Sequence, residues 1–208
     1  MTAQLSTASI VKQQVVFLLL EAVELLDLAG PAQVFSIAAS LGAPYCLHFC
    51  GNISGVRSAQ GLFLGGLEVL LFLSADDLIL VPGVTLEQLS QPLLDVATCD
   101  WLTDAHNRGI CIASICSGAL VLGEVGLLDG RRCTTHWFVV DALQQRYPMA
   151  QVVDGVLYVR DRGIVTSAGI ASGIDMALSL VEQQHGARLA AEVARHLVIY
   201  LRRNGLKG

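Results

Sequence analysis

Short apolar runs alternate with longer helix-like segments along most of this 208-residue chain. The runs, rich in Val, Ile and Leu, predict strands at 15–20, 45–50, 77–83, 110–114, 132–136, 151–153, 157–160 and 164–167. The segments between them predict helices at 29–41, 86–108, 117–126, 138–146, 173–185 and 187–203. This alternation is typical of an α/β fold, in which helices cover both faces of a mainly parallel sheet.

The predicted strands also indicate where a functional site would form. The run 77–83 is almost entirely apolar and ends at Pro82-Gly83, as expected of a central strand that is buried on both faces. Open α/β sheets bind ligands at the carboxyl ends of their strands. We therefore look for functional residues after the strands 15–20, 77–83, 110–114 and 132–136. A turn at 161–163 predicts an antiparallel hairpin appended to the sheet.

The composition excludes disordered, fibrous and membrane-spanning chains. Hydrophobic residues make up 53% of the chain and 20 glycines add to them, whereas apolar residues and Gly together make up about 45–50% of ordinary soluble chains. No tightly apolar run approaches the roughly 18–20 residues of a membrane span, and no secretory signal precedes the first strand. We expect a cytoplasmic protein with a loose N-terminus at 1–14 and one domain over 15–208.

The charge distribution argues against DNA binding by this chain itself. Residues 1–107 contain ten acidic and only two basic residues, whereas residues 108–208 contain eleven basic and eight acidic residues. Binding a polyanion requires clustered Lys and Arg, and the first half has no such cluster. The apolar excess also predicts a homodimer, because it exceeds what one core of this size comfortably buries.

The six cysteines are too few for a disulfide scaffold at this length. Cys46, His48 and Cys50 alternate along the predicted strand 45–50, so their side chains share one face. They form either a soft-metal site or a row of buried thiols against the core. The second interpretation is favoured, and we expect no metal site.

A tight turn is predicted where the strand 110–114 meets the next helix. Ser114 and Gly118 lie two residues before and two after Cys116, and such small residues are needed in a nucleophile elbow. The elbow would place the Cys116 thiol at a helix N-terminus, where backbone N–H groups favour a thiolate and can bind an oxyanion. The alternative is an inert buried thiol.

Two further residues follow strands whose carboxyl ends meet at this edge of the sheet. Asp27 follows the strand 15–20 and either shares a proton with the thiol or caps the helix that starts near Gly30-Pro31. His136 ends the strand 132–136 and contributes an imidazole either to the same crevice or to a backbone hydrogen bond. Because Ser117 rather than His follows Cys116, only spatial proximity would let His136 act as a base.

Four ordered segments carry a family resemblance: FLLLEAVELLDLAGPAQVFSIA, DLILVPG, IASICSGALVLGEVGLLDGRRCTTHW and IVTSAGIASGIDMALSLVEQQHG. Together they resemble the ThiJ/PfpI superfamily, which implies the flavodoxin-like fold of class I glutamine amidotransferases. The resemblance covers residues 14–203. Within the superfamily, the third segment is similar to two subgroups, the N-terminal sensing domains of AraC-type transcriptional regulators and the isonitrile hydratases.

The C-terminal third resembles the regulators, in which this region leads into a pair of helix-turn-helix units. The resemblance implies a ligand-sensing, dimerising domain with a small-molecule effector bound near Cys116 and no cofactor. DNA contact would belong to a C-terminal domain that these 208 residues do not contain. This sensor function is our first hypothesis.

The hydratase resemblance implies an enzyme instead. Cys116 would then be the nucleophile and Asp27 the acid, while Ser117 replaces the usual Thr after the cysteine. The backbone N–H groups of Gly83, Ser117 and Gly118 would bind the developing anion. The product of an isonitrile would be an N-substituted formamide. A redox-responsive thiol protein is the third hypothesis.

Overall fold

The computed structural model describes residues 12–85, 87, 92–199 and 206–207. The strands are β1 (Gln13–Leu18), β2 (Tyr45–Cys50), β3 (Gly55–Arg57), β4 (Phe63–Gly65), β5 (Leu78–Val81), β6 (Cys111–Ile115), β7 (Arg132–Cys133), β8 (Gln151–Val152), β9 (Tyr158–Asp161), β10 (Ile164–Ser167) and β11 (Leu206–Lys207). The helices are α1 (Leu25–Ser40), α2 (Val96–Asn107), α3 (Gly118–Glu124), α4 (Val140–Arg146), α5 (Ile170–His185) and α6 (Ala187–His196), with a 3₁₀ turn η2 (Trp137–Val139) before α4.

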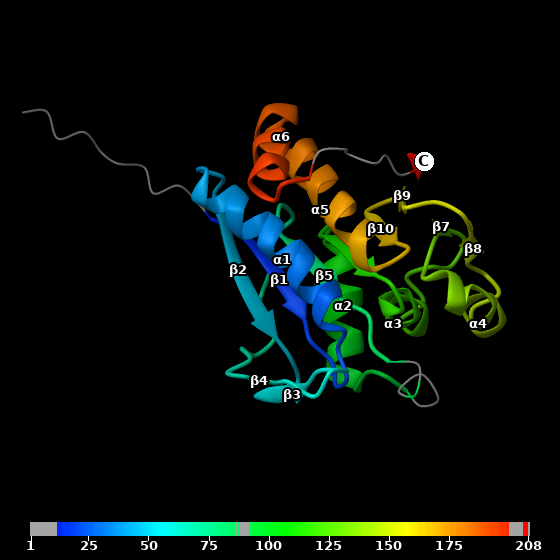
Figure 1. Ribbon diagram of the computed structural model, residues 1–208. Helices are drawn as coiled ribbons and strands as arrows, with labels where there is room; N and C mark the ends of the chain where they lie inside the picture. Colours follow the sequence, from blue (N-terminus) through cyan, green and yellow to red (C-terminus); the bar gives the residue numbers. More distant parts are fainter. Residues whose placement is uncertain (1–11, 86, 88–91, 200–205, 208) are drawn as a thin grey trace, which may run out of the picture.

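A seven-stranded sheet in the order β11-β9-β10-β6-β5-β1-β2 forms the centre of the molecule (Figure 1). The strands from β10 to β2 are mutually parallel, whereas β9 pairs with β10 in the antiparallel sense. The predicted α/β fold and its appended hairpin are therefore confirmed. The hairpin turns at Arg162 and Gly163, which both have positive φ.

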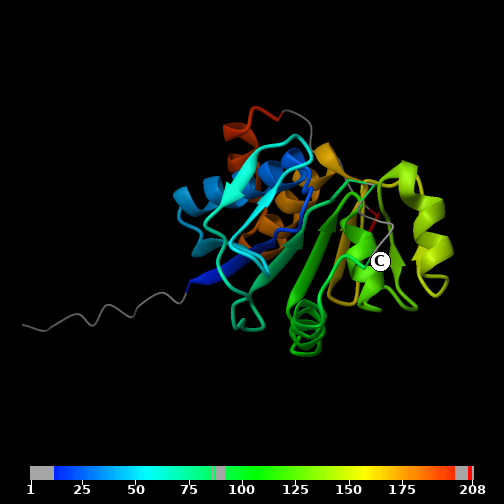
Figure 2. The same cartoon turned by 90° about the horizontal axis from the view of Figure 1, so that it is seen from below.

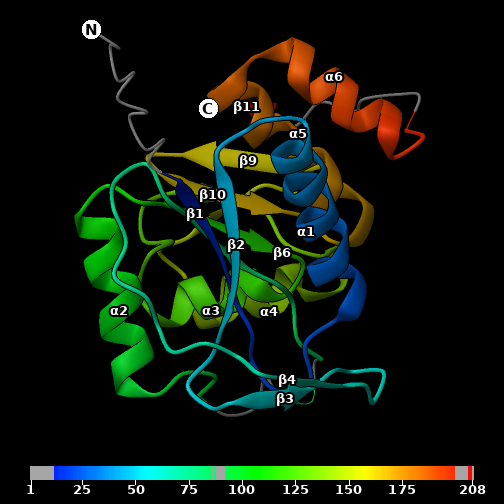
Figure 3. The same cartoon turned by 90° about the vertical axis from the view of Figure 1, so that its left-hand side faces the viewer.

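Helices cover both faces of this sheet. In Figure 3, α1 and α5 lie on one side and α2 lies on the other. Alternate side chains of each strand enter the two cores: Val15 and Phe17 of β1 pack with α1 and α5, whereas Val16 and Leu18 pack with α2 and α3. This two-sided burial explains why the central strands are nearly all apolar.

The first strand begins two residues earlier than the sequence predicted. Gln13 and Gln14 pair in register with Tyr45 and Cys46 of β2, and the Gln13 N–H donates to the Pro44 carbonyl (2.7 Å). These two residues therefore do not belong to a loose N-terminus. The rest of that predicted segment, residues 1–11, lies outside the described residues.

The starts of two helices also differ from expectation. The helix predicted at 29–41 begins at Leu25, so Pro31 lies inside it. The helix predicted at 86–108 begins at Val96, because the Asp95 carboxylate accepts a hydrogen bond from the Thr98 N–H (2.8 Å) and caps it. Much of the expected segment before it, 86 and 88–91, lies outside the described residues, as do residues 200–203 of the helix predicted at 187–203.

The hairpin β3–β4 was not predicted, because its strands are only three residues long and lie among glycines. The arrowheads of β1 and β2 point toward it in Figure 1, and Figure 2 looks onto this end of the molecule. The hairpin therefore lies beyond the carboxyl ends of the parallel strands. In the part of the chain that the structure describes, no helix combines the length and apolar character that a bilayer crossing requires.

Candidate functional site

Cys116 lies at a sharp turn between β6 and α3. Its φ of +57° falls in the left-handed region, which non-glycine residues rarely adopt and which costs about 1–3 kcal/mol. The Cys116 N–H donates to the Ser167 carbonyl (3.0 Å), and the Thr135 hydroxyl donates to the Cys116 carbonyl (2.8 Å). The end of β10 and the segment after β7 therefore hold this strained turn in place.

Glycines allow the backbone to pack closely around the turn. A Cβ at Gly118 would collide with the backbone carbonyl of Val81, at the end of β5. At Gly169, where φ is +120°, a Cβ would lie 3.1 Å from the Cys116 sulfur. The turn therefore leaves no room for a side chain at Gly118, as the nucleophile-elbow pattern in the sequence predicted. Gly169 belongs to a small-residue turn in the sequence, but only the structure shows that it packs against the thiol.

Asp27 lies in the first turn of α1 and is fully buried. It does not cap the helix, because the N-cap residue is Glu24 and no side chain makes a capping bond there. Instead, Asp27 shares a hydrogen bond with the Cys116 thiol. Gly83 permits this approach, since a Cβ there would lie 2.6 Å from Asp27 Oδ2 and 2.8 Å from Ser117 Oγ.

The Cys116 thiol is protonated at neutral pH. Burial, followed by the negative charge of Asp27, raises its pKa to about 12, and a hydrogen bond from the Ser117 backbone N–H opposes this rise. Glu24 adds a further, smaller increase. The expected backbone donor at the helix N-terminus is present and favours the thiolate, but burial and the charges of Asp27 and Glu24 outweigh it.

The Ser117 hydroxyl is engaged in the structure of the elbow. It donates to the Val84 carbonyl (2.7 Å) and accepts from the Val84 N–H (2.9 Å). Because the side chain is buried, these two bonds tie the start of α3 to the loop after β5. The Ser117 hydroxyl therefore has a structural role, because it already donates one hydrogen bond and accepts another from Val84.

His136 reaches the same site from a different element. It precedes η2, and its Nδ1 accepts a long hydrogen bond from the Phe138 N–H (3.4 Å). Among the hydrogen bonds of the described residues, none joins its ring to the Cys116 sulfur. The structure thus brings His136 to the site without pairing it with the thiol.

These residues enclose a cavity of about 300 Å³ at the carboxyl ends of the strands. Its walls come from the loop after β1 and the start of α1, the loop after β5, the Cys116 elbow and η2. The lining residues are Glu24, Asp27, Val84, Thr85, Cys116, Ser117, His136, Trp137, Phe138 and Val139. The structure therefore gathers Asp27, Cys116, Ser117 and His136 around one cavity. Gly83 packs against the first three of these residues.

Glu24, Trp137 and Phe138 line the cavity but were not singled out from the sequence. Glu24 precedes Asp27 by three residues, the spacing that places two side chains on one side of a helix start. The aromatic pair follows His136 directly, yet Trp137 is 72% exposed and Phe138 is 60% exposed. Exposed aromatics give no periodic signal, so their position at the mouth was visible only in the structure.

The possible metal site at Cys46, His48 and Cys50 does not form as such. His48 Nδ1 lies 2.9 Å from Glu68, and Cys50 is buried in the core. Over residues 12–85, 87, 92–199 and 206–207, no three His, Cys, Asp or Glu side chains are grouped to hold a metal ion.

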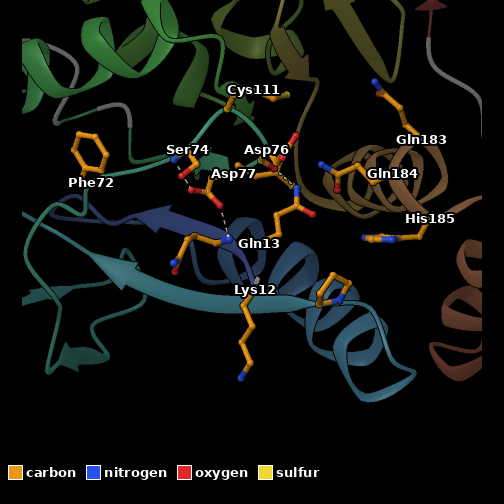
Figure 4. A pocket seen from close by; sticks show the side chains of 14 residues that line it. Lys12, Gln13, Phe72, Ser74, Asp76, Asp77, Cys111, Gln183, Gln184 and His185 are labelled. Atoms are coloured by element: carbon orange, nitrogen blue, oxygen red, sulfur yellow. Dashed lines mark hydrogen bonds between the residues drawn. The ribbon is translucent and has the colours of Figure 1, made fainter. Parts of the chain in front are cut away.

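A second cavity of about 620 Å³ lies at the opposite end of the sheet, where β1 and β5 begin (Figure 4). Its polar side chains serve the fold: Asp77 accepts hydrogen bonds from the backbone N–H groups of Gln14 (2.7 Å) and Ser74 (2.6 Å), and the Tyr45 hydroxyl donates to Gln184 (2.5 Å). Ligands of parallel sheets bind at the other end. The cavity at Cys116 is therefore the stronger candidate.

This chain is similar in sequence to a known protein family and to two characterised kinds of protein. The sequence matches the DJ-1/PfpI family over residues 13–183. The isonitrile hydratase of Pseudomonas putida is 34% identical over 184 residues, which are 88% of this chain and 77% of the hydratase. The HTH-type transcriptional regulator CdhR of Pseudomonas aeruginosa is 40% identical over 103 residues, which are 50% of this chain and 30% of the regulator.

A solved structure of an AraC family transcriptional regulator from Pseudomonas putida is also similar. Its TM-score is 0.76 at 26% sequence identity, and the match covers 89% of this chain and 99% of that chain. The match to CdhR, by contrast, spans less than a third of that regulator's length.

Proposed function

Because this chain belongs to the DJ-1/PfpI family, we propose that it is a ligand-sensing domain of an AraC-type transcriptional regulator, with the cavity beside Cys116 as its effector site. Membership of the family confirms the resemblance found in the sequence. The similarity to CdhR and to the solved AraC family regulator supports the regulatory role. A cavity of about 300 Å³ suits a small-molecule effector.

The position of Cys116 in the cavity wall, with the His136 ring bonded to the Phe138 N–H and not to the sulfur, is the observation that carries this proposal. A thiolate, rather than a thiol, is the nucleophile in cysteine chemistry. Burial and the charge of Asp27 hold the pKa of Cys116 at about 12, and the described hydrogen bonds show no imidazole base on the sulfur. Such a thiol is better suited to contact a bound ligand than to act as a nucleophile.

The proposed regulator contacts DNA through a separate domain and acts as a homodimer. The excess of acidic residues over 1–107 opposes contact between this half and a phosphate backbone. The longer regulators among its relatives are consistent with an additional domain. Light scattering at micromolar concentration tests the dimer, and a monomer would refute that part of the proposal.

The coding sequence that follows the Gly208 codon provides the most direct test of the regulator function. We expect it to encode two helix-turn-helix units. An open reading frame that terminates at Gly208 would contradict the proposal. For a longer reading frame, the full-length protein should bind its promoter DNA with an affinity that changes when an effector is added, and substitutions in the cavity should abolish this change.

A cysteine-dependent hydratase is the second candidate, and the hydrogen bond between Asp27 and Cys116 favours it, as does the similarity to isonitrile hydratase. In this reaction the Cys116 sulfur adds to the terminal carbon of the isonitrile, while Asp27 transfers the thiol proton to that carbon. Water then adds to the resulting thioimidate and displaces the thiol, giving an N-substituted formamide. The backbone N–H groups of Gly83, Ser117 and Gly118 are the proposed donors to the developing negative charge.

Turnover of small isonitriles distinguishes the two candidates. The hydratase function requires formamide production that disappears in Cys116→Ala. A lack of turnover across a panel of alkyl and aryl isonitriles would eliminate it. The sensor function requires binding without turnover.

A further inference from the structure

The charges around the Cys116 cavity all have one sign. Glu24 and Asp27 line it, whereas no Lys or Arg does so among the residues that the structure describes. Next to burial, the negative charges of Asp27 and Glu24 raise the pKa of the Cys116 thiol in the cavity wall. An anionic ligand would be repelled here, and a cationic ligand would be attracted.

The Glu24 carboxylate is held in position by a neutral partner. Gln60 donates from Nε2 to Glu24 Oε2 (2.6 Å), and its Oε1 accepts from the Leu25 N–H (3.2 Å). The Glu24 backbone N–H in turn donates to the Gly83 carbonyl (2.8 Å). Since an amide fixes the carboxylate without cancelling its charge, Glu24 remains available to a ligand.

The outer wall of the cavity is aromatic. The rings of Trp137 and Phe138 are 5.5 Å apart and nearly perpendicular, at 89°, and His136 lies 5.5 Å from Trp137 at a tilt of 40°. His136 Nδ1 accepts a hydrogen bond from the Phe138 N–H. Aromatic faces attract cations, and quaternary ammonium groups in particular bind between such rings.

We infer that the cavity selects small organic cations, with an ammonium group facing Glu24 and Asp27 and its alkyl groups against Trp137 and Phe138. This inference rests on the proposed sensor function, for which it names the class of effector. A site built for an anionic effector would instead be expected to place Lys or Arg side chains in its wall, where they pair with the anion.

A pair of isosteric probes tests the inference. Choline and 3,3-dimethylbutan-1-ol have the same shape, but the quaternary nitrogen of choline is a neutral carbon in the alcohol. We expect choline to bind at least about tenfold more tightly in isothermal titration, since cation–aromatic and charge–charge attraction act together. We expect 3,3-dimethylbutanoate, the corresponding anion, to bind more weakly than the alcohol. Equal affinities for choline and the alcohol, or no choline binding, would overturn the inference.

Substitutions in the cavity wall test whether the preference for choline over the alcohol arises in this cavity. Glu24→Gln keeps the side-chain shape but removes one charge, so it should reduce the preference for choline over the alcohol. Trp137→Leu should weaken choline binding more than alcohol binding. Glu21→Gln is the matched control, because Glu21 belongs to the same loop but does not line the cavity. If Glu24→Gln keeps the full wild-type preference for choline, the cation binds elsewhere and the inference is refuted.

The failures of the two proposals are distinguishable. If the alcohol and choline bind equally and Trp137→Leu weakens both, the cavity is still an effector site and only its charge preference is wrong. If choline is preferred but the reading frame ends at Gly208, the regulator function fails and the cation site remains.

Discussion

The carboxylate of Asp27, in the first turn of α1, shares a hydrogen bond with the thiol of Cys116, at the end of β6. This contact joins two elements that are distant in the sequence, and Gly83 makes room for it. Burial and, after it, the negative charge of Asp27 raise the pKa of the Cys116 thiol. Asp27 therefore acts together with burial to disfavour the reactive thiolate of Cys116.

Replacing Asp27 with Asn should increase the reactivity of Cys116. The substitution removes the negative charge that disfavours the thiolate, so the pKa of Cys116 should fall from about 12. Each unit of decrease raises the thiolate fraction about tenfold at pH values below the pKa. Iodoacetamide labelling of Cys116, followed by mass spectrometry across a pH series, measures this change. Glu68→Gln, which lies outside the cavity, is the control, and slower labelling of Asp27→Asn than of wild type would contradict the expectation.

Alkaline pH should destabilise the fold. Burial raises the pKa of Cys50, Cys111 and Cys133 to about 11 and that of Cys116 to about 12, from an ordinary value of 9.0. The unfolded chain therefore loses these protons at lower pH than the folded chain does. The stabilisation is complete below pH 9 and is lost as the pH rises through the folded values.

Urea unfolding measures this pH dependence. The midpoint should be lower at about pH 10 than at about pH 7, and Cys116→Ala should reduce the difference. The partly exposed Cys46 provides the control, since Cys46→Ala should leave the difference unchanged. An identical midpoint at both pH values in the wild-type protein would show that the buried thiols do not contribute.

Ser117→Ala should destabilise the protein by about 1–3 kcal/mol, because it leaves the buried N–H and C=O groups of Val84 without their hydroxyl partner. Ser117→Thr retains the hydroxyl and should lose less stability if the added methyl group is accommodated. Chemical unfolding of the two variants compares them. Wild-type stability in Ser117→Ala would mean that the loop after β5 does not depend on this hydroxyl.

The site residues that the sequence revealed are those tied to strand ends. Asp27 and Cys116 each follow a predicted strand of the central sheet, and parallel strands bring their carboxyl ends together. His136 reaches the site differently, because the predicted strand 132–136 ends at Cys133 and pairs with β8 in a separate two-stranded sheet. Glu24 was missed because the helix was predicted to start near Gly30-Pro31. The actual start at Leu25 depends on contacts of the preceding loop, such as the bond from the Glu24 N–H to Gly83, and these join distant segments.

The protonation of Cys116 was also beyond sequence reasoning. A helix N-terminus after a strand correctly suggested a donor to the sulfur, and the Ser117 N–H is that donor. Its effect is overcome by burial and by the charge of Asp27, and both depend on how α1 packs over the elbow. The fold was easier to predict, because the alternating burial of β1 and the apolar run of β5 are properties of local sequence.

Two helical glycines offer a test of the packing at the elbow. A Cβ at Gly118 would meet the backbone carbonyl of Val81, which cannot move without disturbing β5. A Cβ at Gly173 would meet the Ile115 side chain at 2.9 Å, which can change its rotamer. Gly118→Ala should therefore destabilise the protein by more than about 2 kcal/mol, and Gly173→Ala by clearly less. Equal urea midpoints for the two variants would contradict this account of the elbow.

His136 should have little influence on the ionisation of Cys116. Although it lines the same cavity, its Nδ1 accepts a hydrogen bond from the Phe138 N–H, and no described hydrogen bond joins its ring to the sulfur. His136→Ala should therefore leave the pH profile of iodoacetamide labelling at Cys116 within about twofold of wild type, whereas Asp27→Asn should shift it. A rate that falls at least about tenfold in His136→Ala would identify the imidazole as the base of the thiol and favour the enzyme over the sensor.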